Sequence, residues 1–301
     1  MANSITTITR YLPYLDEVYA AASLSSVLDT ADALVRETAD AKTFLVANIA
    51  MDGLGNYSRT ASAGFVPGDV TLSWESHTFS YDRGRSFQID AMDDEETLGQ
   101  AFASLSSQFI RTRVAPEVDA LRFAKYATGA GTTASAALTA ATAVTAITTA
   151  ETAMQEAEVD LNSAVLFLTP TVLGYIKEDT THFSRPLDPA SDPNRNFATF
   201  DGMRVVVVPQ SRFYSSVTLY DGTTDSQTGG GYVKTATTGK DLNFLIVDPS
   251  AVIQIAKHAK TRVFAPDVNQ QADAYKVDYR IYHDAWVKTK RTKGIYAHTK
   301  A

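Results

Sequence analysis

The chain has 301 residues, of which 45% are hydrophobic and 20% are charged, and its 27 Lys/Arg against 34 Asp/Glu give a formal net charge of −7. It contains no cysteine, which excludes disulfide bonds, thiolate metal sites and a cysteine nucleophile. The acidic balance argues against a protein that coats nucleic acid over its whole surface. At this length a single hydrophobic core is at or just beyond its limit, so two subdomains are expected.

Residues 1–45 are predicted to form a long arm. They carry two loose helical stripes of apolar residues, and Pro13 interrupts the first of them. The stripes leave two interpretations open: a docking element for a neighbouring chain, or a helix packed on the chain's own core. No charged segment precedes an apolar run, so no signal peptide is expected. Because no apolar run reaches the roughly 18 residues of a membrane span, the product is expected in the cytoplasm.

Residues 46–92 have the pattern of an extended loop. Glycines and prolines separate short alternating stretches at 70–74 and 78–81, which predicts a two-stranded hairpin with Trp74, Phe79 and Tyr81. An isolated hairpin is marginally stable in water. We therefore expect these aromatic side chains to need a surface to lie on, either their own domain or an adjacent subunit.

A strand at 85–89 followed by a long helix is predicted for the next stretch. Asp93 and Glu96 have the spacing of a capping box at the helix start. The apolar stripe of the helix consists of Leu98, Phe102, Leu105 and Phe109, resumed by Val118, Leu121 and Tyr126. Pro116 should kink or restart the helix. If continuous, a helix over 94–127 would span about 50 Å.

Arg83 and Arg85 flank a glycine at the root of the hairpin. Arginine presents a planar fork of donors to carboxylates. Both residues are therefore candidates for ion pairs across a subunit contact. The alternative is local pairing with Asp82 or Asp90.

Residues 128–149 form a low-complexity run of Thr, Ala and Gly. Residues 129–134 fit a dinucleotide-binding fingerprint in form, but they follow a helix and not a strand, so a hinge and then a helix are predicted. Beyond them, strands are predicted at 164–168, 203–208, 242–247 and 261–264, and helices at 150–160, 171–177 and 249–257. This alternation indicates a compact α/β layer over about 146–265.

The C-terminal part is predicted to hold one long strand and one short one. Residues 274–287 alternate between apolar and polar positions, which indicates a strand of roughly 45 Å, and 294–297 form a terminal strand. Residues 257–301 hold ten Lys/Arg against four Asp, so this segment carries +6 and the rest of the chain −13. A basic tail on an acidic body can dock onto other copies of the chain. A solvated basic face and a phosphate-binding surface are the alternatives.

No catalytic, cofactor-binding or metal-binding residues are predicted. The five histidines are scattered, and none has metal-ligand spacing. The sequence has no nucleophile elbow, phosphate-binding loop or SxxK motif. A soluble α/β enzyme would need a concave site with convergent titratable groups, so an enzyme is not expected.

Several segments, in order and spacing, resemble the major capsid proteins of tailed bacteriophages. They are RGRSFQID, MDDEET, VAPEVDALRFAK, AETAMQEAEVDLNSAVLFLTP, DGMRVVVVP and DAYKVDYRIYHDAWV. The resemblance implies an α+β fold, the tailed-phage major capsid fold that encapsulin shells share. Its parts would be an N-terminal arm (1–45), an extended β-hairpin loop (46–92), a peripheral domain with a long spine helix and long β-strands (93–145 and 266–301) and an axial α/β domain (146–265).

The same resemblance implies a structural protein of the virion, made in the cytoplasm of a bacterial host. It would assemble into hexamers and pentamers of an icosahedral head around double-stranded DNA, packaged without sequence specificity. A separate scaffolding protein and a portal are the expected partners, and the alternative within the fold is an encapsulin-like cellular nanocompartment shell. The candidates for contacts between subunits are Trp74, Phe79, Tyr81, Arg83 and Arg85.

Some members of that family join their subunits by an isopeptide bond from a lysine in the extended loop. Here no lysine lies between Thr43 and Ala124. We therefore expect a shell that is held together without covalent links.

Overall fold

The computed structural model of the chain describes residues 23–29, 35–37, 42–57, 59, 64–92, 108–178 and 199–301. The chain divides into two compact units: a smaller one, Ala31–Tyr81, and a larger one made of Met1–Thr30 and Asp82–Ala301. The capping box expected at Asp93 and the first half of the long helix's apolar stripe lie outside the described residues.

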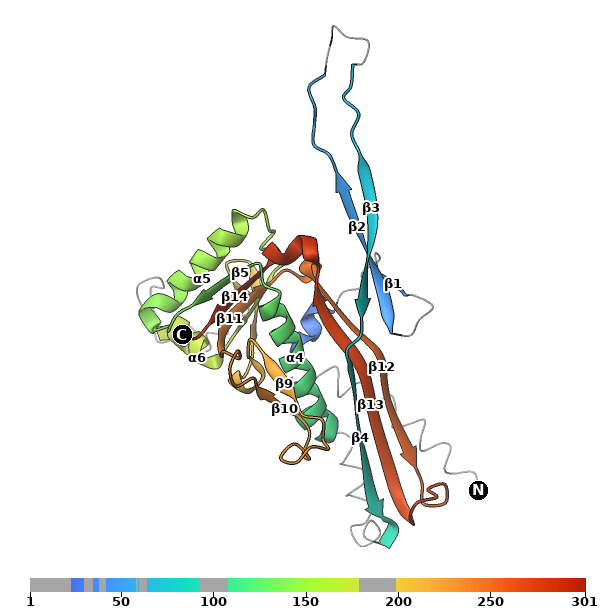
Figure 1. The fold of residues 1–301 in the computed structure, drawn as a ribbon. Coiled ribbons are helices and arrows are strands. Elements are labelled where there is room, and N and C mark those ends of the chain that lie inside the picture. The colour runs from blue at the N-terminus through green and yellow to red at the C-terminus, as the bar shows by residue number, and fades with distance from the viewer. Residues whose placement is uncertain are drawn as a thin grey trace. The chain divides into compact units, whose positions relative to one another are not determined.

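The larger unit contains a six-stranded mixed sheet in the strand order β5-β14-β11-β6-β8-β7. Figure 1 shows β5, β14 and β11 side by side in this sheet. Its strands are β5 (Thr132–Ser135), β6 (Val165–Leu168), β7 (Thr199–Phe200), β8 (Met203–Val207), β11 (Leu242–Val247) and β14 (Ile295–Thr299). β14 runs parallel to β5 and antiparallel to β11, and β6 runs antiparallel to β11 and parallel to β8. The strands predicted at 164–168, 203–208, 242–247 and 294–297 are confirmed as β6, β8, β11 and β14.

Helices cover both faces of this sheet. They are α4 (Ala115–Thr128), α5 (Ala140–Gln155) and α6 (Pro170–Glu178). On one face, Phe123 of α4 shares a core with alternate strand residues such as Leu245. On the other face, α5 and α6 share a core with the intervening strand residues, among them Phe244. Strands that are covered on both faces need apolar side chains at consecutive positions, as the sequence has them.

A second sheet in the larger unit has three strands in the order β12-β13-β4. They are β4 (Tyr81–Asp90), β12 (Val252–Phe264) and β13 (Ala274–Val287). β13 confirms the predicted alternating strand of 14 residues, and the strand predicted at 85–89 lies within β4. β12 pairs with β13 in antiparallel register along the length of both strands, with one irregularity between Ala256 and His258.

A π-helical turn, η2 (Ile110–Val114), leads directly into α4. Pro116 lies in the first turn of α4 and cannot donate a hydrogen bond to the preceding turn, which accounts for the irregular helical geometry here. The core between this helix and β13 consists of Ile110, Val114, Val118, Tyr279 and Ile281. Phe109 extends it, because its ring lies 4.8 Å from that of Phe87 and 5.9 Å from that of Tyr279.

Short elements complete the larger unit. They are η1 (Ser25–Leu28), η3 (Gln210–Arg212), β9 (Val217–Leu219), β10 (Tyr232–Lys234), η4 (Pro249–Ala251) and η5 (Thr289–Gly294). β9 and β10 pair antiparallel and enclose the loop at residues 220–231. β7 and β8 are joined by a two-residue turn, in which Asp201 and Gly202 have φ of 45° and 87°, the left-handed conformation that tight hairpin turns require.

The smaller unit is a three-stranded antiparallel sheet in the order β1-β2-β3. Its strands are β1 (Val35–Glu37), β2 (Thr43–Met51) and β3 (Val70–Thr78). A hairpin is present, as predicted, but its strands differ from the expected stretches at 70–74 and 78–81: residues 70–78 are one strand, and its partner is β2, which begins at Thr43. The hairpin is therefore β2–β3 with a long tip at residues 52–69.

The predicted helix at 249–257 is also wrong. Asp248 does cap a helical turn, since its carboxylate accepts a hydrogen bond from Ser250 N at 3.0 Å, but the turn ends at Ala251. From Val252 the chain is β12, so the short strand predicted at 261–264 is the end of a strand of 13 residues. The β-branched residues that follow find a long strand, β13, to pair with, and this pairing overrides the local helix-start signal.

Candidate assembly surfaces

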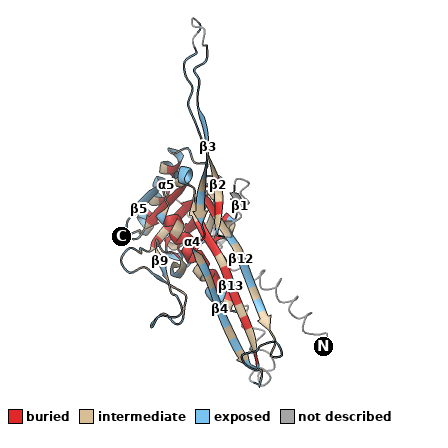
Figure 2. Ribbon diagram, turned by 45° about the vertical axis from the view of Figure 1, so that its right-hand side comes forward, coloured by how far each residue is buried: buried red, intermediate tan, exposed pale blue. Residues whose placement is uncertain are grey.

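The β2–β3 hairpin carries an exposed apolar face. Met51 pairs directly with Val70, Ile49 with Leu72, and Ala47 with Trp74. Residues that are directly opposite on two strands point to the same side of a sheet, so these six side chains form one continuous surface, called the hairpin face below. Met51 and Val70 are 71% and 73% exposed, and Ile49 and Leu72 are each 56% exposed. Figure 2 shows β3 exposed along most of its length.

The other side of the same ribbon is different in character. Toward the tip it carries small and polar side chains and no large apolar ones, with Asn48 opposite Ser73 and Ala50 opposite Thr71. Toward the base it forms the unit's own small core, where the Phe44 ring lies 5.3 Å from His77 and 5.6 Å from Phe79. Beyond Val46 the ribbon consists of β2 paired with β3. Such a single layer of strands has no second layer of its own to cover an apolar side. The hairpin face is therefore a surface of the kind that marks an interaction site.

The three aromatic candidates from the sequence occupy different positions. Trp74 lies on the hairpin face and is 41% exposed. Phe79 is buried in the small core against Phe44. Tyr81 is half-buried at the start of β4. Their contacts with another subunit stay predictions, and Trp74 has the position that fits such a contact best.

Arg83 lies at the root of β4 and is engaged within the larger unit. Its Nε donates to Glu117 Oε1 at 2.6 Å, its Nη1 to the Tyr220 carbonyl at 2.7 Å and its Nη2 to the Gly231 carbonyl at 3.4 Å. Arg85 Nη1 donates to the Thr228 carbonyl at 3.1 Å. The two arginines thus hold the loop at residues 220–231 against β4. Their role in ion pairs between subunits stays a prediction.

The alternative for Arg83, a local pair with Asp82 or Asp90, is not the pairing seen, because Arg83 pairs with Glu117. Asp82 accepts instead from Arg280 of β13, whose Nε lies 2.8 Å from Asp82 Oδ1. Successive side chains of a strand point to opposite faces, so Asp82 and Arg83 of β4 cannot both face α4. The arginine faces the helix and finds Glu117 there.

Replacing Arg83 by lysine should loosen the loop at residues 220–231. The three hydrogen bonds of Arg83 start from three nitrogen atoms at different positions, and the single nitrogen of a lysine cannot occupy all three. A bond to a charged group contributes about 1.5–3 kcal/mol. We expect amide hydrogen exchange in this loop to become about tenfold faster. Arg85→Lys is the matched control, since it removes a single exposed contact and should change the exchange less. Equal exchange in wild type and Arg83→Lys would contradict this role.

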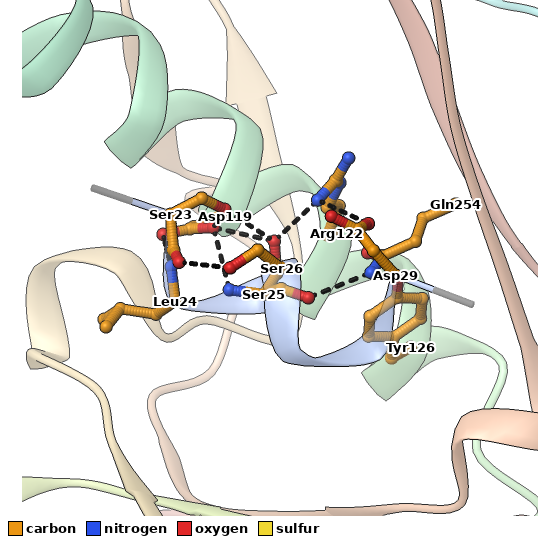
Figure 3. A network of polar contacts seen from close by, with 9 residues as sticks. All are labelled: Ser23, Leu24, Ser25, Ser26, Asp29, Asp119, Arg122, Tyr126 and Gln254. Carbon is orange, nitrogen blue, oxygen red and sulfur yellow. Dashed lines mark hydrogen bonds and ion pairs between the residues drawn. The ribbon is translucent and has the colours of Figure 1, made fainter. Parts of the chain in front are cut away.

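Residues 23–29, called the N-terminal anchor below, are fixed to one face of α4 (Figure 3). The buried Asp119 carboxylate accepts from Ser23 Oγ at 2.8 Å, from Leu24 N at 3.0 Å and from Ser25 Oγ at 2.7 Å. Arg212 Nη1 lies 3.3 Å from the same carboxylate. These donors and the positive charge of Arg212 offset the cost of burying the Asp119 carboxylate.

Two further residues of α4 continue this contact. Arg122 Nη1 donates to Ser25 Oγ at 2.9 Å and lies 3.7 Å from Asp29. Tyr126 donates to Gln254 Oε1 at 2.8 Å, and the Gln254 amide donates to the Ser25 carbonyl at 2.9 Å. Positions 119, 122 and 126 lie on one side of a helix. Burial raises the pKa of Tyr126, so its hydroxyl remains a donor at neutral pH.

The anchor also contributes apolar side chains to the larger unit. Leu28 is buried in the core that contains Phe123 and Tyr126, and Val27 packs against the same core. These two residues of the predicted arm thus lie on the chain's own core, while most of the arm lies outside the described residues. The arm's point of attachment is therefore set by α4.

The described residues hold neither a cluster of metal-binding side chains nor a helix that could span a membrane. Within 23–29, 35–37, 42–57, 59, 64–92, 108–178 and 199–301, no group of three or more His, Asp and Glu side chains could hold a metal ion. None of the helices in this part of the chain is long and apolar enough to cross a bilayer.

Comparisons with known proteins give a likeness in structure alone. No family model matches the sequence, and no curated protein matches it. A structure from Mycobacterium phage Che8 superposes with a TM-score of 0.61 at 12% identity, over 86% of this chain and 85% of that one. The capsid structure of cyanophage P-SCSP1u gives 0.61 at 13% identity, over 88% and 85%.

A virus-like particle from Pyrococcus furiosus gives a TM-score of 0.52 at 10% identity, over 96% of this chain and 99% of that one. The chain therefore has the fold of phage capsid structures and of this virus-like particle, as its sequence resemblance predicted. At sequence identities of 12%, 13% and 10%, the likeness shows the fold alone.

Proposed function

We propose that this protein is the major capsid protein of a tailed bacteriophage and forms its shell from many copies of itself. The observation that carries the proposal is the hairpin face, an apolar surface on a ribbon too thin to cover it. Burying a Leu- or Ile-sized side chain is worth about 1.5–3 kcal/mol. A second copy of the chain that covers this face would gain that energy at each contact, and the capsid fold supports the same function.

The parts of the subunit have distinct roles in this proposal. The axial domain, at the centres of hexamers and pentamers, contains the six-stranded sheet with α5 and α6. Two strands of this sheet, β5 and β14, come from the segments 93–145 and 266–301 that the sequence assigned to the peripheral domain. The β12-β13-β4 sheet with η2 and α4 acts as the peripheral domain, and the helix that ends in α4 is the spine helix of that domain. The hairpin overlaps a neighbouring copy, and the N-terminal arm extends from its anchor on α4. Closed point-group symmetry lets one sequence build a sealed container.

The contents and partners follow from this role. The shell encloses double-stranded DNA without reading its sequence, assembles with a separate scaffolding protein, and receives DNA through a portal. It is a component of the virion that is made in the cytoplasm of a bacterial host. In this proposal the protein has a structural role, and no enzymatic reaction is assigned to it.

A nanocompartment shell is the second candidate. The observation in its favour is the likeness to the Pyrococcus furiosus virus-like particle over nearly the whole of both chains. The contents of purified particles distinguish the two candidate functions. A phage head produced during infection holds DNA, whereas a nanocompartment holds protein cargo.

Electron microscopy and analytical ultracentrifugation of the purified chain test the proposal. We expect closed shells tens of nanometres across, together with free hexamers and pentamers. A homogeneous monomer or dimer of the 32.6 kDa chain at every concentration and ionic strength tried would overturn it.

Denaturing gel electrophoresis of the assembled particles tests the absence of covalent links. We expect a single band at the mass of one chain, because the hairpin offers no lysine as a nucleophile between Thr43 and Ala124. A ladder of multimers that survives boiling in detergent would show that another pair of residues forms a covalent bond.

A further inference from the structure

The connection between β13 and β14 carries an exposed basic cluster. Residues 288–293 read KTKRTK, with no acidic residue among them, and Figure 1 shows this turn in red where the chain passes from β13 to β14. Lys290, Arg291 and Lys293 are exposed. No ion pair joins these three side chains, called the basic turn below, to a carboxylate in the described part of the chain.

Backbone hydrogen bonds fix the position of the basic turn. Gly131 N donates to the Thr292 carbonyl at 2.8 Å, and Asp248 N donates to the Gly294 carbonyl at 2.8 Å. A Cβ at residue 131 would lie 2.7 Å from the Thr292 carbonyl oxygen, so this close approach requires glycine. The Asp248 carboxylate caps η4 by accepting from Ser250 N at 3.0 Å. The cations are therefore presented from a fixed backbone.

The turn that follows α5 carries the opposite charge. Glu156, Glu158 and Asp160 are exposed, while Val159 and Leu161 pack into the core that α5 shares with the sheet. Residues 156–160 contain no Lys, Arg or His. Within the described ranges, no ion pair joins these three carboxylates, called the acidic turn below, to a cation.

Both turns lie at the same end of the six-stranded sheet. Ile295, the first residue of β14, pairs with Val247 of β11, and Val247 pairs on its other side with Val165, the first residue of β6. The basic turn directly precedes β14, and the acidic turn ends five residues before β6. Since neighbouring strands are 4.7–4.9 Å apart, the starts of β14 and β6 are separated by about 10 Å. One end of the sheet therefore carries both clusters.

We propose that the basic turn of one copy binds the acidic turn of a second copy across a two-fold axis. A two-fold contact brings the same surface of both copies together, so a cation cluster and a carboxylate cluster on one surface form two equivalent sets of ion pairs. Opposite charges across a contact select the partner and set the register. The inference rests on the proposed function, because it assigns one of the contacts between copies in the shell.

A phosphate-bearing polyanion is the other ligand that a basic cluster can take. It fits this end of the sheet less well, because it would meet the carboxylates of the acidic turn as it approached the cations. The net charge of −7 on the whole chain opposes its approach as well. A second copy, in contrast, offers each cluster its opposite charge.

Thiol cross-linking of concentrated or assembled protein tests the contact, since the chain contains no cysteine. Chains with Arg291→Cys are mixed with chains with Glu156→Cys, treated with a short thiol-specific cross-linker and separated on a denaturing gel. We expect a band at twice the mass of one chain, and little of it from either variant alone. The matched control replaces Glu156→Cys by Asp225→Cys, which lies in the loop at residues 220–231, and should give single chains.

A chain that carries both Arg291→Cys and Glu156→Cys tests the symmetry. Across a two-fold axis both cross-links join the same two copies, so the product should stop at twice the mass of one chain. A head-to-tail contact would link each copy to two different neighbours and give a ladder of multimers, which would overturn the two-fold arrangement. A cross-link within one chain leaves its mass unchanged and does not affect this comparison.

The role of charge is tested in the same mixture. Lys293→Glu on the Arg291→Cys chain should lower the yield of dimer by about three- to tenfold, and Glu158→Lys on the Glu156→Cys chain should restore most of it. Raising the salt from about 50 mM to about 500 mM before cross-linking should lower the yield as well. A yield that Lys293→Glu leaves unchanged would overturn the assignment of these charges to the contact.

A gel that shows only single chains overturns the inference. Lys290→Cys with Glu158→Cys probes the same contact at a second pair of positions, should a variant of the first pair fail to fold. Electron microscopy of the same samples reports shell formation separately, so shells without cross-linked dimers refute this contact and leave the proposed function standing. If, without cross-links, a DNA duplex binds wild type and not Lys290→Glu, the basic turn is a phosphate site and the inference is wrong.

Discussion

Leu72→Asp should abolish shell assembly while the subunit stays folded. Leu72 lies in the middle of the hairpin face, 56% exposed and directly opposite Ile49. A shell contact would bury this side chain, and a carboxylate there would have to give up its water without gaining a partner. This desolvation cost adds to the lost burial of the leucine side chain. We therefore expect the protein concentration needed for assembly to rise by about 100-fold or more.

The matched control is Thr71→Asp, the preceding residue on the same strand. Thr71 faces the polar side of the ribbon and pairs with Ala50. Both variants place one charge at an exposed position. The free energy of unfolding of either subunit, measured by thermal unfolding, should therefore change by about 0.5 kcal/mol or less. Assembly measured by light scattering should be lost in Leu72→Asp and retained in Thr71→Asp. Equal assembly of the two variants would show that the hairpin face does not contact another copy.

Asp119→Ala should destabilise the larger unit strongly. The substitution removes the acceptor of four donors of the N-terminal anchor, Ser23 Oγ, Leu24 N, Ser25 N and Ser25 Oγ, and removes the carboxylate beside Arg212. Removal of one partner from a buried charged network costs about 3–5 kcal/mol. We therefore expect the melting temperature to fall on the order of 10 °C, measured by calorimetry on unassembled subunits.

Ser26→Ala is the control for this network. Ser26 Oγ donates to the Ser23 carbonyl at 2.8 Å within the anchor and does not contact Asp119. Its removal should cost about 1 kcal/mol. If Asp119→Ala cost no more than Ser26→Ala, the anchor would not be held by the Asp119 carboxylate.

Local sequence patterns predicted five strands of the larger unit, β6, β8, β11, β13 and β14. β11 and β13 have the bounds expected from their apolar runs and alternation. Both signals are local: a strand that is covered on two faces is apolar throughout, and one that is covered on a single face alternates. Such patterns do not depend on which other strand completes the sheet.

Pairing between distant strands was the part that the sequence could not define. Val70–Thr78 pairs with a strand that begins at Thr43 and lies across a long tip, so no turn signal connects the two. Most of the helix predicted at 249–257 is the start of β12, and the strand that pairs with β12 lies beyond residue 273. In both places the deciding contact is absent from any local window.

The buried network on α4 was hidden for a different reason. Asp119 and Arg122 are three residues apart, the spacing of an exposed ion pair on a helix surface. In the fold α4 is buried nearly all round, so both charges lie inside. Their partners, Ser23 and Ser25, belong to a segment whose serines gave no signal of their own. The charged residues within a helix that is otherwise apolar were the sign that could have found it.

Cryo-electron microscopy of assembled particles tests the central claim most directly. We predict that Ile49, Leu72 and Trp74 of each chain lie against another copy, buried in a contact between subunits. A closed shell in which the hairpin face stays exposed to solvent, or folds back onto its own chain, would contradict the claim that assembly completes the burial of this ribbon.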